Sequence, residues 1–133
     1  MIHGEHTVRV RYAETDQMGI AHHSNFFIWF EIGRIELLRQ SGFHYHEMEA
    51  EDCHLPVVDV RCRYKAPARY DDELRIQTEV KSIRGPVLHF VYKVLRAGDG
   101  LLLAEGESVH IVTDSKMQKK VLPEKYLAGF QGK

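Results

Sequence analysis

The sequence is poor in the features that mark several classes of protein. It has two cysteines, Cys53 and Cys62, in 133 residues, which is too few for a disulfide scaffold. It has 18 basic and 19 acidic side chains, so it lacks the basic surplus that a dedicated DNA or RNA binder needs. The longest apolar run, Phe26 to Phe30, is far short of the ~20 residues that span a bilayer. We therefore expect no nucleic-acid partner and no integral membrane contact.

The first residues alternate between polar and apolar types and lack the apolar stretch of a secretory signal. Together with the low cysteine content, this predicts a reduced, cytoplasmic protein, although a Cys53–Cys62 disulfide is left open. Apolar residues make up 44% and charged residues 28%, which is close to globular averages and excludes disorder. Because no internal repeat or linker is present, residues 1–133 are predicted to form a single domain.

Residue periodicity predicts an α+β fold in the order β-α-β-β-β-β. Alternation of polar and apolar residues and the turns between them indicate the strands 7–12, 58–66, 74–81, 87–95 and 101–112. A helix is expected over 25–41, capped at Ser24-Asn25 and ended by Gly42. An ordered loop precedes this helix, and a short second helix follows Pro123.

The expected helix 25–41 is apolar around most of its circumference and should be largely buried. Gly33 lies in its middle, where glycine costs ~1 kcal/mol relative to alanine, and close approach of another backbone explains its presence. A sheet wrapped around the helix would require such an approach. Strands 87–95 and 101–112 are apolar on both faces over much of their length, which one helix cannot cover. They are therefore central strands, part of a subunit interface or both, and we expect a homodimer at minimum.

The loop before the helix contains a carboxylate, Asp16, that has two interpretations. The free N–H groups and the positive dipole end of the helix could stabilise a developing oxyanion, while Asp16 activates water or attacks a carbonyl itself. In the structural alternative, Asp16 only caps a turn ahead of Gly19. Both interpretations stay open at this point.

The loop follows a recognisable spacing: an Asp, a Gly three residues later, and a His followed by x-Asn, which are Asp16, Gly19, His23 and Asn25. Further matches extend over nearly the whole chain: Tyr64-x-Ala-Pro67-Ala-Arg69-Tyr-Asp71-Asp72, Arg84-Gly85, Lys116-Met117 and Leu122-Pro123. In these residues the chain resembles the hotdog-fold acyl-CoA thioesterases of the 4-hydroxybenzoyl-CoA thioesterase and YbgC-like type. The resemblance is strongest to the branch encoded beside the bacterial Tol-Pal envelope system.

The resemblance implies a five-stranded antiparallel sheet wrapped around one long central helix. It implies an acyl-CoA substrate and no metal or redox cofactor, since coenzyme A is part of the substrate. Asp16 would be the catalytic carboxylate, the backbone N–H of His23 would polarise the thioester carbonyl, and Gly19 and Asn25 would complete the site. Similar hotdog proteins pair their subunits and form tetramers, so a homotetramer is expected.

Four cationic side chains are candidates for binding the coenzyme A phosphates: Arg61, Arg63, Lys65 and Arg84. The alternative for each is a solvated position on a strand or turn. Nine histidines raise the question of a metal site. The pairs 22–23 and 44 with 46 lack the i, i+4 spacing or the cysteine partners of a zinc site, so no metal site is predicted.

Two other functions are compatible with a hotdog fold. A hotdog hydratase that acts on enoyl thioesters would carry an Asp-x-Asn-Pro-x-His motif, and this motif is absent from the chain. A non-catalytic hotdog module that binds acyl-CoA would keep the same shell. Acyl-CoA hydrolysis is the favoured prediction, and the binding module is its alternative.

Overall fold

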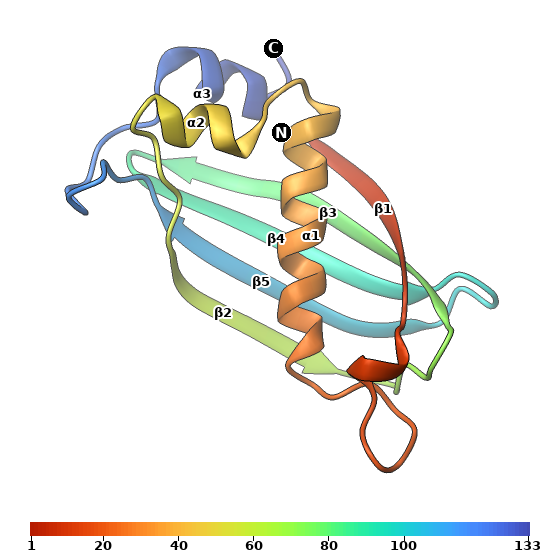
Figure 1. The fold of residues 1–133 in the computed structure, drawn as a ribbon. Coiled ribbons are helices and arrows are strands. Elements are labelled where there is room, and N and C mark those ends of the chain that lie inside the picture. Colours follow the sequence, from red (N-terminus) through yellow and green to blue (C-terminus); the bar gives the residue numbers. More distant parts are fainter.

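The computed structural model describes residues 1–133 as a curved sheet with one helix lying across it (Figure 1). The strands are β1 (His3–Arg9), β2 (Val57–Tyr64), β3 (Glu73–Arg84), β4 (Val87–Arg96) and β5 (Leu102–Ile111). The helices are α1 (Asn25–Gln40), α2 (Tyr45–Ala50) and α3 (Glu124–Phe130), with a single 3-10 turn, η1 (Tyr12–Glu14). A membrane-spanning stretch is absent from the helices, each of which is too short or too polar to cross a bilayer.

All neighbouring strands are antiparallel, in the order β1-β3-β4-β5-β2. The predicted five-stranded antiparallel sheet is therefore confirmed. β4 and β5 lie inside the sheet, as their apolar character predicted, whereas β1 and β2 form its edges. The inner face of β4 is fully buried, with Leu88, Phe90 and Val94 at 0% exposure. These side chains belong to the hydrophobic core of the chain.

Helix α1 has the predicted bounds to within one residue, and its buried face carries Phe26, Phe30 and Leu37. Gly33 lies on that face. A Cβ built there would come within 2.5 Å of Thr78 Oγ1 and 2.7 Å of an Ile76 methyl group. The predicted close approach of helix and sheet is thus confirmed. Burial around most of the circumference is wrong, because Phe27 and Ile28, which lie outside that buried face, are 36% and 47% exposed.

The first strand begins and ends earlier than its apolar alternation indicated. β1 pairs with β3 from His3, opposite Glu79, to Arg9, opposite Glu73. Because β3 begins at Glu73, the chain has no partner strand beyond Arg9, and it turns into η1. Tyr12, expected at the end of the strand 7–12, instead lies in η1 and is 78% exposed.

Strand β2 also departs from the alternation of polar and apolar residues that predicted it, which is typical of a strand with one buried face. Its side chains are exposed on both faces, including Val58 at 53% and Val60 at 38%. The reason is its position, because β2 is an edge strand and α1 packs mainly against β1 and β3. Cys62 in this strand and Cys53 before it are both free thiols, so the disulfide left open from the sequence does not form.

A chain of buried polar groups lies between α1 and the sheet. Arg34 donates to the Tyr92 hydroxyl at 3.1 Å, and the hydroxyls of Tyr92 and Ser108 are hydrogen-bonded to each other. Ser108 lies 2.8 Å from His110 Nε2, and His110 Nδ1 lies 2.9 Å from Leu55 O. A carbonyl oxygen only accepts, so Nδ1 carries the proton and Nε2 accepts from Ser108. Every donor therefore points in one direction, from Arg34 to Leu55.

Candidate active site

The loop between η1 and α1 folds back on itself as a small hairpin. Residues Thr15 and Ala21 form an isolated antiparallel bridge, and the Asp16 N–H donates to Ile20 O at 2.8 Å. At the tip, the Gly19 N–H donates to Asp16 O at 3.0 Å, and Gly19 has φ +77°, a conformation that favours glycine. This closed tip explains why a glycine stands three residues after Asp16.

Asp16 is half-buried at the base of this tip, and its carboxylate caps the turn. Oδ1 accepts the Met18 N–H at 2.8 Å, which is the structural role considered from the sequence. Oδ2 has no hydrogen-bond partner in the chain. The cap therefore occupies one oxygen and orients the carboxylate, while the other oxygen is free to receive a proton.

His23 offers an unused backbone donor next to the first turn of α1. Its N–H makes no hydrogen bond, although the N–H groups of His22 before it and of Ser24 and Asn25 after it all do. The carbonyl oxygen of His22 accepts both the backbone N–H of Asn25 at 3.0 Å and its side-chain Nδ2 at 3.2 Å. The His22 carbonyl and the His23 N–H belong to one trans peptide group, so they point in opposite directions. Because the carbonyl is held toward Asn25, the His23 N–H points away from α1.

Asn25, which the sequence placed in the site without a specific role, is thus a clamp on the peptide that carries this N–H. Its Nδ2 also donates to Glu14 O at 2.8 Å. The N-cap residue is Ser24, within the predicted Ser24-Asn25, but the Ser24 side chain makes no capping bond and lies 2.8 Å from His22 Nδ1 instead. The side chain of Asn25 therefore fixes the position of the chain where α1 begins.

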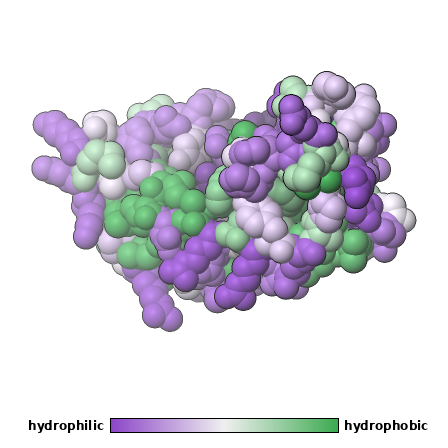
Figure 2. Space-filling view, turned by 90° about the horizontal axis from the view of Figure 1, so that it is seen from below, coloured by the Kyte–Doolittle hydropathy of each residue, from purple (hydrophilic) through white to green (hydrophobic).

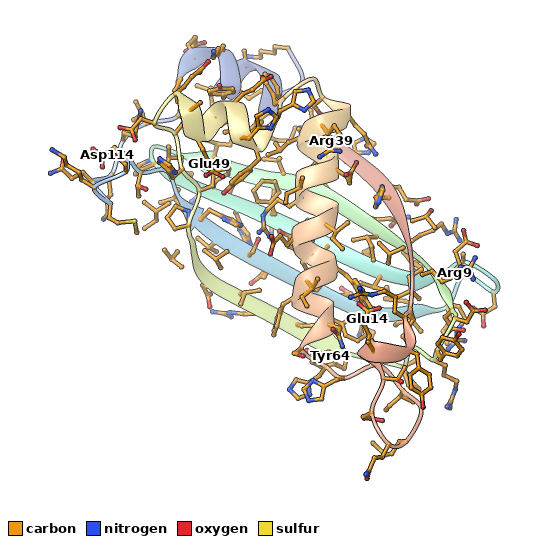
Figure 3. All side chains as sticks on the ribbon, viewed as in Figure 1. Arg9, Glu14, Arg39, Glu49, Tyr64 and Asp114 are labelled. Atoms are coloured by element: carbon orange, nitrogen blue, oxygen red, sulfur yellow. The ribbon has the colours of Figure 1, made fainter.

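Glu14 is a buried site residue that sequence reasoning missed. Only 6% of it is exposed, and its carboxylate accepts the Arg11 N–H at 2.7 Å and Trp29 Nε1 at 3.3 Å. Its carbonyl accepts the His22 N–H at 2.8 Å, which ties the far end of the loop to η1. Figure 3 shows Glu14 near the N-terminal end of α1. No sequence signal marks it, because a glutamate three residues after an arginine normally indicates a solvated pair.

Asp16 and His23 line the same open cleft of about 460 Å3. Seven of its eleven lining residues are apolar, and they come from the loop, from the first turn of α1 and from the segment 64–68 after β2. Tyr64, which Figure 3 labels beside the start of α1, also lines the cleft. A carboxylate and a free N–H at the mouth of an apolar cleft suit the hydrolysis of a carbonyl compound with an apolar tail.

A larger hollow of about 630 Å3 lies away from Asp16, across all five strands. Charged side chains of both signs line much of it, among them Arg61 and Arg63, Glu105 and Glu107. It holds neither the candidate carboxylate nor the free N–H, and so it is not the candidate active site. No group of three or more His, Cys, Asp or Glu side chains is arranged to hold a metal ion.

The structure brings one of the four phosphate-binding candidates to the cleft. Lys65 lines it and also lies 3.8 Å from Glu105. Arg61 pairs with Asp59 and Glu107, which fits the solvated alternative. Arg63 lines the larger hollow instead. Arg84 lies at the end of β3 that is remote from the loop, and the 12 residues of β3 span roughly 35 Å (Figure 1).

Comparison with known proteins relates the whole arrangement to thioester hydrolases. A family model described as the thioesterase-like superfamily matches residues 10–130. The "Acyl-CoA thioester hydrolase YbgC" of Escherichia coli is 37% identical over 93% of this chain and 92% of its own. The "Putative acyl-CoA thioesterase YneP" of Bacillus subtilis is 36% identical over 86% of this chain and 82% of its own.

Solved structures show the same fold. A hypothetical protein from Thermus thermophilus, TT1821, superposes with a TM-score of 0.91 and 34% identity, over 96% of this chain and 97% of its own. The 1,4-dihydroxy-2-naphthoyl-CoA thioesterase Slr0204 from Synechocystis superposes with a TM-score of 0.90 over 97% of this chain and 96% of its own. The latter is 19% identical, and at that level the likeness concerns the fold alone.

Proposed function

The chain belongs to the thioesterase-like superfamily and is a thioester hydrolase, and from this premise we propose that it cleaves acyl-CoA thioesters to a free acid and coenzyme A in the cleft beside Asp16. The observation that carries the proposal is the pairing of two groups in one apolar cleft. One is a carboxylate with a free oxygen, and the other is a backbone N–H, at His23, that has no partner.

In the proposed reaction the thioester carbonyl oxygen accepts the His23 N–H, beside the positive end of the α1 dipole. Water attacks the carbonyl carbon and gives a proton to Asp16 Oδ2, and the negative charge that develops on the carbonyl oxygen is stabilised by the N–H. The C–S bond then breaks, and the proton held by Asp16 passes to the leaving thiolate. The reaction consumes only water and uses one carboxylate and one N–H as catalytic groups, so the proposal includes no metal or redox cofactor.

Asp16 has two proposed modes of action, as general base or as nucleophile, and isotope labelling separates them. Direct attack would form an anhydride between Asp16 and the acyl group. In a single turnover in ¹⁸O water, hydrolysis of that anhydride at the aspartyl carbon places ¹⁶O from the carboxylate in the acid product. General-base action places ¹⁸O from water in the product instead. We favour the general base, in which Oδ2 takes the proton from water while Oδ1 keeps its bond to the Met18 N–H.

Lys65 is the cation that we propose for the phosphates of coenzyme A, because it lines the cleft that holds Asp16. The long flexible stem of lysine allows its ammonium group to leave Glu105 and reach a phosphate at the mouth of the cleft. Phosphate binding by the other three candidates stays a prediction, because within a single chain they lie away from this cleft: Arg61, Arg63 and Arg84. The cytoplasmic location expected from the sequence also stays a prediction.

We further propose that the chain assembles as a homodimer at least, with the tetramer as a prediction beyond it. Strands 87–95 and 101–112, where the sequence places an interface, bury much of their apolar surface within the single chain. The better support is a set of exposed apolar side chains: Val57, Val58 and Val60 on the edge strand β2, and Phe27 and Ile28 on α1. Figure 2 shows a patch of apolar side chains on the side of the molecule seen from below. Burial of such a patch stabilises association.

Light scattering at micromolar concentration tests the assembly. A dimer or tetramer is expected, and Val58→Glu with Val60→Glu should convert it to monomers, because two carboxylates would then enter the apolar patch. A stable monomer of the wild-type chain would contradict the proposal.

The proposed function is tested by the release of free thiol from a panel of acyl-CoA thioesters that varies chain length and aromatic character. Hydrolysis of at least one member is expected, and the pattern of rates defines the acyl preference. The non-catalytic alternative predicts that acyl-CoA binds, as isothermal calorimetry would detect, while no thiol is released from any member. That result would overturn the proposal.

A further inference from the structure

Tyr64 makes a contact with the site that the proposed reaction does not use. Its hydroxyl donates to the carbonyl oxygen of His23 at 2.9 Å. Tyr64 is the last residue of β2, so this bond joins the end of an edge strand to the residue whose N–H is free. The ring packs edge-on against Phe26, with the ring centroids 5.1 Å apart, and closes one side of the cleft.

The position of the His23 N–H depends on the two peptide groups that His23 joins. The preceding peptide is held through His22 O, which accepts two hydrogen bonds from Asn25. The following peptide is held through His23 O, which accepts the Tyr64 hydroxyl and, at 3.2 Å, the Phe26 N–H. With both peptide planes held, His23 keeps one backbone conformation although it lies in an exposed loop.

The hydroxyl of Tyr64 is committed to this bond and is a permanent donor. Burial and the neighbouring Cys62 raise the pKa of Tyr64 to about 12, so the phenol stays protonated at neutral pH. Since its only proton points at His23 O, it has none to donate to a substrate. Two other tyrosines, Tyr12 and Tyr70, are exposed like Tyr64, but their hydroxyls make no hydrogen bond within the chain.

We infer that Tyr64 is a positioning residue, whose hydroxyl holds the His23 peptide so that the free N–H stays aimed at the developing oxyanion. This inference rests on the proposed function. The oxyanion exists only in the transition state, and a donor that is misaligned therefore lowers kcat more than it changes substrate binding. The ring of Tyr64 contributes to the wall of the cleft, and its hydroxyl contributes to the rate.

The substitution Tyr64→Phe separates these contributions, because it keeps the ring and removes the hydroxyl. We expect kcat for acyl-CoA hydrolysis to fall roughly tenfold, the usual weight of one lost hydrogen bond in an aligned site, while KM changes less than about twofold. Tyr70→Phe is the matched control, since it removes an exposed hydroxyl that holds nothing, and its kcat should equal that of the wild type. Equal melting temperatures for the three proteins establish that the fold is unchanged.

A second measurement reads the hydroxyl proton itself. Tyr64 is replaced by 3,5-difluorotyrosine, whose phenol is far more acidic but has nearly the same shape. The pH profile of kcat should then gain a fall on the alkaline side, because a phenolate cannot donate to His23 O and repels it. The same replacement at Tyr70 should leave the profile unchanged. A role of the ring in packing alone predicts no such change at either position.

The outcomes separate this inference from the proposed function. A Tyr64→Phe protein with the kcat of the wild type, or with a raised KM and normal kcat, would overturn the positioning role while hydrolysis by the wild type stands. If the wild type and Tyr70→Phe both release no thiol from any acyl-CoA, the proposed function fails, and the positioning role fails with it.

Discussion

Acidification from pH 7 to pH 5 should destabilise the fold by about 2 kcal/mol through one buried histidine, His110. Its imidazole is fully buried, and burial, reinforced by the nearby Arg34 guanidinium, lowers its pKa from 6.5 to about 4. The folded protein therefore keeps His110 neutral, with its proton on Nδ1 donated to Leu55 O. The ring cannot be protonated without breaking the Ser108 hydrogen bond at Nε2.

The sign and the size of the effect follow from the two pKa values. Between pH 6.5 and pH 4 the unfolded chain binds a proton that the folded chain does not, so stability falls as the pH falls through this window. A pKa difference of about 2.5 sets an upper limit of roughly 3 kcal/mol, of which about 2 kcal/mol is lost by pH 5. The carboxyl groups with lowered pKa, such as Asp52 and Asp99, lose their contribution only at lower pH, as they become protonated.

Urea unfolding at a series of pH values between 8 and 4.5 measures this effect. His110→Gln keeps an amide donor for Leu55 O but has no group that titrates, so its stability should vary by less than about 0.5 kcal/mol over the window attributed to His110. His46→Gln is the control, because His46 is exposed and should retain the pH dependence of the wild type. Equal pH dependence of the wild type and His110→Gln would refute the reasoning.

Three further predictions concern packing, the clamp on the loop and the coenzyme. Gly33→Leu should cost about 1 to 3 kcal/mol or more in urea unfolding, because even a Cβ meets Thr78 and Ile76; unchanged stability would contradict the close approach. Asn25→Ala should lower kcat roughly tenfold by removing the side-chain one of the two hydrogen bonds that hold the His22 carbonyl, and a normal kcat would contradict the clamp. Lys65→Ala should raise KM for acyl-CoA several-fold and leave KM for acyl-pantetheine unchanged, because pantetheine lacks the nucleotide; equal effects would contradict phosphate binding.

The sequence predicted the parts of the fold that depend on local patterning. The bounds of α1 followed from an apolar run that ends at Gly42, and the turn before Val87 followed from its glycine and proline. Residues 3–6 of β1 carry little strand signal of their own, because pairing with β3 is what holds them extended. Helix α2 was missed for a similar reason: its six residues include a single buried side chain, Met48, which gives no periodicity to detect.

The candidate site was predictable only where its reactive groups lie close together in the sequence. Asp16 and His23 are close in sequence, and their spacing led to both. Glu14 looks like a solvated charge until Trp29, fifteen residues later, covers it and donates to it. The hydrogen bond from Tyr64 to His23 joins residues 41 apart, and no local pattern reports such a contact. Positive charge alone marks the phosphate candidates in the sequence, and charge does not report that the sheet separates Arg84 from Lys65.

The most direct test of the account is the kcat of Asp16→Asn with the best acyl-CoA substrate of the panel. The asparagine oxygen can still accept the Met18 N–H, so the turn is kept and only the basic, nucleophilic oxygen is lost. We predict that kcat falls by roughly 10² to 10⁴, with KM little changed and the circular dichroism spectrum of the wild type. A folded Asp16→Asn protein with near-normal kcat would show that Asp16 only caps the turn, and would contradict the account.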